Sequence, residues 1–395
     1  MIWQNISIMV QLPIYLDYNA TTPCDPRVVE AMLPYFNKFF GNAASRNHLF
    51  GWQAEEATCL AREQVAKLIN AEPNEIIFTS GATESDNLAI KGIFEMYAGI
   101  GNHIITVNTE HKAVLDTCAH IEKLGAEITY LQVDKEGLIN LAQLEAAITQ
   151  KTILIAIMYA NNETGVIQPI SDISKIARKH NVFFFTDATQ AVGKIPVDVK
   201  KEGIDVMAFS AHKIYGPKGT GALYVRRKSP RVKMTAQMDG GGHERGLRSG
   251  TLNVPGIVGF GKACELCINE MQEDSKRTRS YRDRLEAGIL ELESSFANGS
   301  KEHRLPNVTN ISFKHIEGNS LLIGLNKDIA VSSGSACTSA LPEPSHVLKS
   351  MGLEDDLAHS SIRFAIGRFT TEEEIQYAID HVNKTVKHLR ETIIV

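Results

Sequence analysis

Residues 182–213 read VFFFTDATQAVGKIPVDVKKEGIDVMAFSAHK. Two short apolar runs in this stretch, residues 182–186 and 206–210, predict buried strands because they are rich in branched and aromatic side chains. Asp187 comes directly after the first run, and Lys213 is the third residue after the second run. In open parallel sheets, polar groups at the carboxyl ends of strands meet at one edge, where ligands bind. We therefore expect the carboxylate and the lysine to share a site.

The same pattern extends outward from this stretch. Apolar runs at residues 104–107, 128–133, 153–158 and 221–225 predict further strands. Segments with helical spacing lie between them, at residues 113–124, 141–148 and 170–180. Strands that alternate with helices predict an α/β fold with a mainly parallel sheet covered by helices.

Length and a change of character predict two domains. The 395 residues exceed the size at which a single core usually keeps growing. After residue 263 the chain changes to a long charged helical pattern, residues 264–293, followed by strand-like pieces such as 308–313. We predict a large α/β domain of residues 17–268, and a smaller α+β domain of residues 1–16 and 269–395.

Composition excludes several classes of function. An apolar content of 43%, a charged content of 22% and a net charge of -5 describe an ordinary globular protein without the basic surplus that stable nucleic-acid binding needs. No run approaches the roughly 20 apolar residues that span a bilayer. The six scattered cysteines indicate reduced thiols and a cytoplasmic protein. Cys264 and Cys267 form a C-x-x-C without a second pair, so we predict no metal site.

Asp187 and Lys213 together indicate pyridoxal phosphate, PLP. The carboxylate can hold the pyridinium nitrogen charged, and the lysine can form a Schiff base with the cofactor. Gln190 is placed to hydrogen-bond the ring hydroxyl. Taken singly, a lysine after a strand is most often a surface residue, and an aspartate most often caps a helix.

Two segments are candidates for the cofactor phosphate. The small residues 80–85 precede a helical pattern, so the amides of Ala82 and Thr83 can approach an anion at a helix N-terminus. Ser210, Ala211 and His212 would complete the site from the next strand end. A simple Ser/Thr cap with Glu84 in the first turn is the alternative.

Three further polar residues follow apolar runs or lie within one. His111 opens a helix and can stack on the ring and move protons, although a capping histidine is the alternative. Asn162 lies in the cluster 161–165 and can bind the ring oxygen or a substrate carboxylate, although such clusters are often only turns. Arg363 suits a substrate carboxylate, with a rim salt bridge as its alternative.

Two loops complete the candidates. Residues 240–251 form a glycine-rich loop that ends in Thr251 and either reaches a neighbouring subunit's phosphate or is only a mobile connection. Cys337 lies among small residues in 332–340, which is typical of an accessible, reactive thiol rather than a structural one.

These motifs together resemble the cysteine desulfurases of the class V aminotransferase family, of the housekeeping type that feeds iron–sulfur cluster assembly. The resemblance runs from residues 16–23 (LDYNATTP) and 79–87 (TSGATESDN) through the Lys213 region and the Cys337 loop to Arg363. It implies a PLP-dependent enzyme of fold type I, a homodimer whose large domain holds a seven-stranded sheet.

The resemblance also implies roles for the residues. L-cysteine is the implied substrate, with Asn162 and Arg363 on its carboxylate and Lys213 as the base for its α-proton. Cys337 would take the sulfur as a persulfide and release alanine. Ring contacts are implied for His111, Asp187 and Gln190. The implied phosphate ligands are Ala82, Thr83, Ser210, Ala211, His212 and Thr251 of the partner subunit.

Two departures and two rival functions accompany the resemblance. Ala43 stands where the family often has proline, and the chain ends at Val395 where relatives carry a further tail for docking the cluster scaffold protein. We therefore expect sulfur release and, with less support, transfer to a scaffold and to tRNA thiolation. The rivals are another PLP enzyme, such as an aminotransferase or a selenocysteine lyase, and a non-catalytic sulfur carrier.

Overall fold

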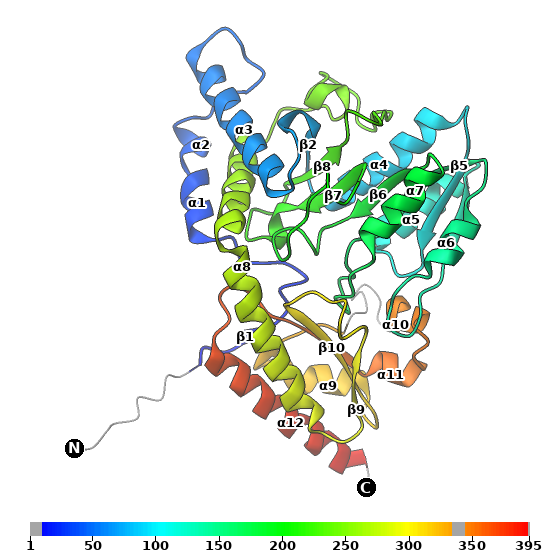
Figure 1. The fold of residues 1–395 in the computed structure, drawn as a ribbon. Coiled ribbons are helices and arrows are strands. Elements are labelled where there is room, and N and C mark those ends of the chain that lie inside the picture. Colours follow the sequence, from blue (N-terminus) through cyan, green and yellow to red (C-terminus); the bar gives the residue numbers. More distant parts are fainter. Residues whose placement is uncertain (1–9, 334–343, 394–395) are drawn as a thin grey trace.

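The computed structural model describes residues 10–333 and 344–393, which form two parts with separate sheets (Figure 1). The larger part holds a seven-stranded sheet with the order β2-β8-β7-β6-β5-β3-β4. Its strands are β2 (Ile76–Thr79), β3 (His103–Val107), β4 (Glu127–Leu131), β5 (Thr152–Ala156), β6 (Phe183–Asp187), β7 (Val206–Ser210) and β8 (Gly221–Val225). Strands β3 to β7 pair in parallel, whereas β8 is antiparallel to both of its neighbours.

Helices cover both faces of this sheet, as the parallel strands require. One face packs on α4 (Ala82–Tyr97) and α5 (Lys112–Glu122). The other face packs on α3 (Leu49–Leu68), α6 (Leu141–Ala147), α7 (Ile170–Lys179) and the first half of α8 (Val254–Leu290). The shorter helices are α1 (Pro26–Met32), α2 (Pro34–Asn37), η1 (Pro73–Glu75), η2 (Ala211–Lys213) and η3 (Glu244–Gly246).

The mainly parallel sheet predicted from the sequence is confirmed, and the differences lie at strand ends. The runs 206–210 and 221–225 match β7 and β8 residue for residue. The runs 128–133 and 153–158 each extend two residues past β4 and β5, because the ladders with β3 end near Val107. Strand β2 was not predicted, since its four residues carry too little pattern to separate it from the following turn.

The smaller part is built on an antiparallel sheet of β9 (Ser295–Asn298), β10 (Val308–Phe313) and β12 (Ser361–Ala365). A separate core joins this sheet to the second half of α8, to α9 (Gly318–Leu325) and to α12 (Glu372–Ile393). The N-terminal strand β1 (Ile14–Tyr15) pairs here with β11 (Ile329–Ala330). The helices α10 (His346–Ser350) and α11 (Asp355–His359) lie beside it. The predicted boundary at residue 268 falls inside α8, and the division into two domains stays a prediction.

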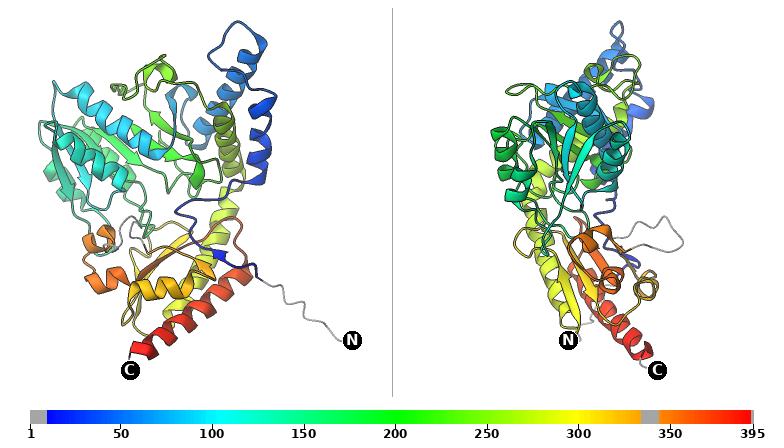
Figure 2. Two further views of the ribbon diagram at one scale, coloured as in Figure 1. Left: turned by 180° about the vertical axis from the view of Figure 1, so that it is seen from behind. Right: turned by 90° about the vertical axis from the view of Figure 1, so that its right-hand side faces the viewer.

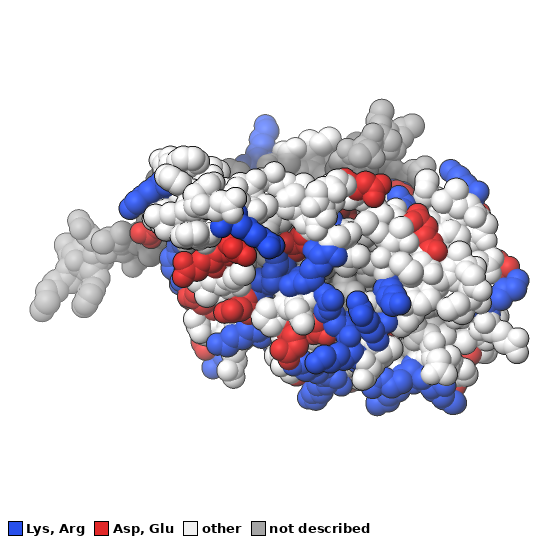
Figure 3. Space-filling view, turned by 90° about the horizontal axis from the view of Figure 1, so that it is seen from above, with Lys and Arg blue, Asp and Glu red and all other residues white. Residues whose placement is uncertain are grey.

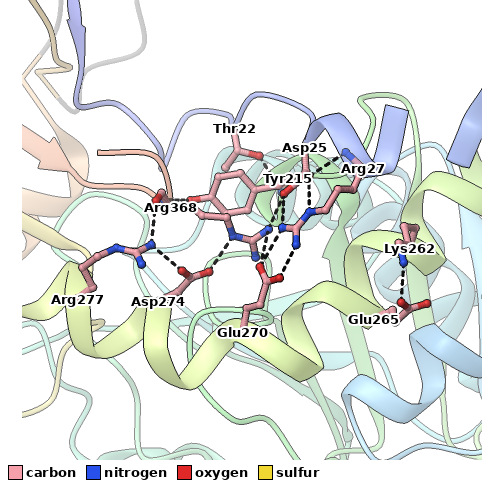
Figure 4. Close-up of polar contacts among 10 residues, drawn as sticks. All are labelled: Thr22, Asp25, Arg27, Tyr215, Lys262, Glu265, Glu270, Asp274, Arg277 and Arg368. Carbon is pink, nitrogen blue, oxygen red and sulfur yellow. Dashed lines mark hydrogen bonds and ion pairs between the residues drawn. The ribbon is translucent and has the colours of Figure 1, made fainter. Parts of the chain in front are cut away.

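The long helix α8 runs along both parts (Figure 2), and a buried ion-pair cluster beside it ties them together (Figure 4). Arg368 follows β12, and its guanidinium binds Asp25 at 3.0 Å and Asp274 of α8 at 2.8 Å. The guanidinium also stacks on the ring of Tyr215, 4.4 Å from its centre. Asp25 is the N-cap of α1, so one arginine joins the start of the larger part to the end of the smaller sheet. Breaking such a buried cluster costs about 3–5 kcal/mol.

Candidate active site

A cavity of about 690 Å³ opens at the carboxyl ends of the parallel strands and is closed on one side by β12. A volume in this range is typical of cofactor sites. It brings together most of the residues that the sequence singled out, namely Ala82, Thr83, His111, Asn162, Asp187, Gln190, Ser210, His212, Lys213 and Arg363.

Two of the predicted site residues that the structure describes do not line this cavity. Ala211 is fully buried behind it and its amide donates to the Thr220 carbonyl at 3.0 Å, so the predicted phosphate contact of this amide is wrong. Thr251 is exposed and lies outside the cavity of its own chain. Cys337 lies outside the described residues.

Lys213 ends in the cavity on η2, directly after β7. Its Nζ donates to the backbone carbonyls of Asn19 at 2.5 Å and Ala20 at 2.7 Å. The pKa of Lys213 is lowered to about 8, mainly by burial and secondly by the nearby Arg363 guanidinium. Asp187 acts in the opposite direction. The lysine therefore has a substantial neutral fraction near neutral pH, which nucleophilic attack on an aldehyde requires.

Asp187 and Gln190 stand at the end of β6, held by their neighbours. Asp187 is buried and its Oδ1 accepts from the Thr189 amide at 2.9 Å, so it closes a turn, and the capping of a helix is wrong. Gln190 Oε1 accepts from Lys194 Nζ at 2.6 Å. Gln190 Nε2 donates to the carbonyl of Asn19 at 3.0 Å. These bonds fix the orientation of the amide, so that its amino group is the available donor.

The segment that we predict to bind the cofactor phosphate lies at the start of α4. Gly81 is the N-cap and has no capping side-chain bond, so the Ser/Thr cap is wrong. The first amides of a helix lack intrahelical partners and attract anions. Gly221 allows β8 to pack closely against the start of α4, because a Cβ at this position would lie 2.6 Å from the Gly81 Cα. Burial and neighbouring lysines lower the pKa of His212 to about 4, so its ring is neutral and can donate one hydrogen bond.

His111 both caps a helix and lines the cavity, whereas the glycine-rich loop is held by ion pairs. His111 caps α5, since its Nδ1 accepts from the Ala113 amide at 3.1 Å, and its ring also lines the cavity. In the neutral ring the proton is therefore on Nε2. The loop 240–251 is tied down rather than merely connecting, because buried Glu244 accepts from Arg62 at 2.7 and 2.8 Å. Arg248 in turn binds Glu84 of α4 at 2.8 Å.

Arg363 projects from β12 into the other side of the cavity. Its Nη2 pairs with Asp17 at 2.6 Å and its Nη1 donates to the Asn162 carbonyl at 3.1 Å. The salt bridge that was the alternative is therefore present, but the guanidinium is buried and not at a rim. Among the described residues, no partner reaches the buried Arg363 Nε. The Arg363 side chain lines the cavity, and a guanidinium in that place favours an anionic ligand such as a carboxylate.

Sequence reasoning from single motifs missed several lining residues. Asn19, Ala20 and Thr21 lie beside Lys213, and the Asn19 Nδ2 also donates to the Asn162 carbonyl at 3.1 Å. These three residues belong to the LDYNATTP stretch, which contributed to the family resemblance but did not by itself indicate a role for any of them. Lys194 was missed as well, because nothing in its surroundings marks a lysine that binds Gln190. Burial lowers its pKa well below the usual value, with Lys213 and Arg363 acting in the same direction.

The donor set fits PLP. A carboxylate, a lysine of lowered pKa and a helix N-terminus face one cavity, which matches the three groups by which the cofactor is held: ring nitrogen, aldehyde and phosphate. Thr189 lines the same cavity, and its buried hydroxyl has no partner among the residues that the structure describes.

Residues 14–378 match the family described as aminotransferase class-V. The chain belongs to this family. Cysteine desulfurase IscS of Photorhabdus laumondii subsp. laumondii is 58% identical over 97% of the chain and 95% of its own length. The protein of that name from Escherichia coli O139:H28 is 57% identical over the same shares.

Solved structures agree with this class-V assignment. A NifS-like protein is 38% identical, with a TM-score of 0.89 over 96% of this chain and 100% of its own. SspA in complex with cysteine is 37% identical, with a TM-score of 0.81 over 91% of this chain and 100% of its own. Fold type I and PLP, both expected from the resemblance, are confirmed.

Proposed function

We propose that this class-V enzyme is a PLP-dependent cysteine desulfurase that takes sulfur from L-cysteine, forms a persulfide on Cys337 and releases L-alanine. The observation that carries the proposal is one cavity in which Lys213 and Asp187 face the buried guanidinium of Arg363. The names of the relatives and the cysteine bound to one of them support the substrate.

Different residues of the chain bind different groups of the cofactor. When bound, PLP supplies an electron sink that stabilises negative charge on the substrate α-carbon. Asp187 holds a proton on the ring nitrogen, and Gln190 donates to the ring oxygen. His111 covers the ring. The helix amides at Ala82 and Thr83, with Ser210 and His212, bind the phosphate.

A second set of residues binds the substrate and removes its α-proton. Arg363 binds the α-carboxylate, with Asn162 beside it, which turns the α-hydrogen of the substrate toward Lys213. Lys213 Nζ takes that proton, and the Asn19 and Ala20 carbonyls, at 2.5 and 2.7 Å, stabilise the resulting ammonium. The Cys337 thiolate then attacks the substrate sulfur; the carbon–sulfur bond breaks and its electron pair stays with the carbon skeleton, which becomes alanine on protonation.

A homodimer is part of the proposal. Exposed apolar side chains gather on α1 to α3 and the loop between them, namely Leu33, Phe36, Phe40, Leu49, Phe50 and Trp52. Such a patch favours burial against a second copy. Thr251 is exposed and would complete the phosphate site of the partner. On the face seen from above, wide uncharged areas surround a middle region in which charges of both signs lie side by side (Figure 3).

We further propose that the persulfide supplies iron–sulfur cluster assembly through a scaffold protein, and tRNA thiolation through other acceptors. The similarity to proteins named IscS supports the first role. None of the helices in the described parts is long and apolar enough to cross a membrane. The buried, unpaired Cys118, Cys264 and Cys267 support a reducing compartment, the cytoplasm.

Cys337→Ser tests the function. We expect the visible absorbance of the bound cofactor to remain, while sulfide and alanine formation from L-cysteine fall to background. Cys59→Ser is the matched control, since Cys59 is exposed on α3, and this variant should keep full activity. Full activity of Cys337→Ser would refute the persulfide mechanism.

A further inference from the structure

The start of α10 is hydrogen-bonded to a buried carboxylate of the larger part. Ser345 is the N-cap of α10, and its Oγ accepts from the Leu348 amide at 3.2 Å. The same hydroxyl donates to Glu163 Oε2 at 2.5 Å. Both side chains are 3% exposed. Glu163 belongs to the turn that presents its neighbour Asn162 to the cavity, so this bond, the Glu163–Ser345 link, joins α10 to the substrate side.

A second contact supports the same placement. His346 Nε2 donates to the backbone carbonyl of Glu110 at 3.0 Å, one residue before His111. The apolar side chains of α10 pack together with Val133, which follows β4. The first turn of α10 is therefore held against the wall of the cavity, although the helix belongs to the C-terminal third of the chain.

The chain before Cys337 is anchored at the substrate side as well. Ser332 pairs with Arg363 as an antiparallel bridge, and the Arg363 amide donates to the Ser332 carbonyl at 2.7 Å. Cys337 thus lies in sequence between two anchors, Ser332 and Ser345. One is bonded to the backbone of Arg363, and the other to the neighbour of Asn162.

A buried carboxylate such as that of Glu163 is energetically unfavourable for a contact that is purely structural. Burial raises its pKa to about 7, against the opposing effects of the Ser345 hydroxyl and the charge of Arg363. A neutral acceptor would hold a helix cap without that cost. What a carboxylate adds is a shorter, charge-assisted hydrogen bond that defines position more strictly.

We propose that Glu163 is a positioning residue for sulfur transfer, which fixes the start of α10 through Ser345 and so sets where the segment bearing Cys337 returns to the substrate side. The proposal rests on the proposed role of Cys337. Glu163 itself touches neither cofactor nor substrate; it acts through the link.

The test separates substrate binding from sulfur transfer in the holoenzyme. The variants are Glu163→Gln, Ser345→Ala and the double variant. L-cysteine affinity is measured from the change in cofactor absorbance, and transfer from alanine formed in a single turnover. We expect affinity within about threefold of the parent and transfer slowed by about tenfold or more, the range of one charge-assisted hydrogen bond. The double variant should be no slower than the slower single variant.

Two controls keep the result interpretable. Thr309→Ala removes a comparable hydroxyl bond to a buried carboxylate, 2.6 Å from Glu286 in the smaller part, and should change neither quantity. Ser345→Gly removes the donor but leaves a residue that helix N-caps accept, so it should match Ser345→Ala if loss of the cap is not the cause.

Normal transfer in Glu163→Gln would overturn the proposal, and so would additive effects in the double variant. Equal losses in affinity and transfer would reduce Glu163 to a structural residue. Failure of the proposed function is a separate outcome, because it is read from Cys337→Ser in the parent background.

Discussion

The two sides of the cavity are built in different ways. The cofactor side comes from the ends of consecutive strands of one sheet, so that Asp187 at the end of β6 and Lys213 just after β7 share one cavity and are only 26 residues apart in the chain. The substrate side is assembled from distant segments, with Arg363 of β12 bonded to Asp17 and to the Asn162 carbonyl. The first side is a property of one sheet, and the second exists only when the two parts of the molecule meet.

This difference predicts which step each substitution affects. Changes on the cofactor side should act on cofactor attachment and proton transfer, whereas changes on the substrate side should leave the cofactor in place. The variants below test that separation. A substrate-side substitution that also released the cofactor would show that the two sides are not independent.

The largest effect is expected for Lys213→Ala. It removes the covalent attachment and the base at once, and a positioned base alone contributes about 10²–10⁴-fold to a rate. We expect alanine formation to fall by roughly 10³-fold or more. Borohydride reduction of the parent holoenzyme, followed by peptide mapping, should place the cofactor adduct on Lys213. An adduct on Lys218, which also lines the cavity, or on Lys194, which binds Gln190, would contradict the assignment.

The same contrast explains how much the sequence could predict. The cofactor side was predictable because strand runs and the polar residues after them fix where Asp187, Ser210 and Lys213 lie. Arg363 was predicted only as a side chain type suited to a carboxylate; its partner Asp17 lies 346 residues away, and no local pattern encodes that pairing. Lys194 and Glu163 were missed for the same reason, since their meaning depends on tertiary contacts. Strand β2 was missed because it is short.

A smaller, selective effect is expected for Arg363→Lys. An ammonium keeps the charge but cannot reach Asp17, the Asn162 carbonyl and a substrate carboxylate together. Loss of one charge-assisted bond corresponds to a fall of roughly 10–100-fold in kcat/KM. We expect most of it in KM, with the cofactor absorbance unchanged. Loss of bound cofactor in this variant would show that the two sides are not separable.

The last prediction concerns stability and its dependence on pH rather than a rate. The folded state raises the pKa of Glu163 from 4.5 to about 7, so it binds the proton more tightly than the unfolded chain does. This residue therefore costs no stability below pH 4.5, costs more as the pH rises toward 7, and carries its full penalty above 7. The penalty is roughly 3 kcal/mol. Glu163→Gln removes it, so the variant should match the parent at low pH and melt at a higher temperature at pH 8.

Glu286→Gln provides the control of opposite sign. Its carboxylate is also largely buried, but Arg304 at 2.6 Å and the Thr309 hydroxyl hold its pKa below the usual value despite the burial. Glu286 therefore stabilises the fold above its unfolded pKa, and its replacement should lower the melting temperature at pH 8. Thermal unfolding at pH 5 and pH 8 measures both variants. A Glu163→Gln variant that is more stable at pH 8 yet slow in sulfur transfer would separate positioning from stability; one that is less stable at pH 8 would place Glu163 with Glu286 as a structural carboxylate.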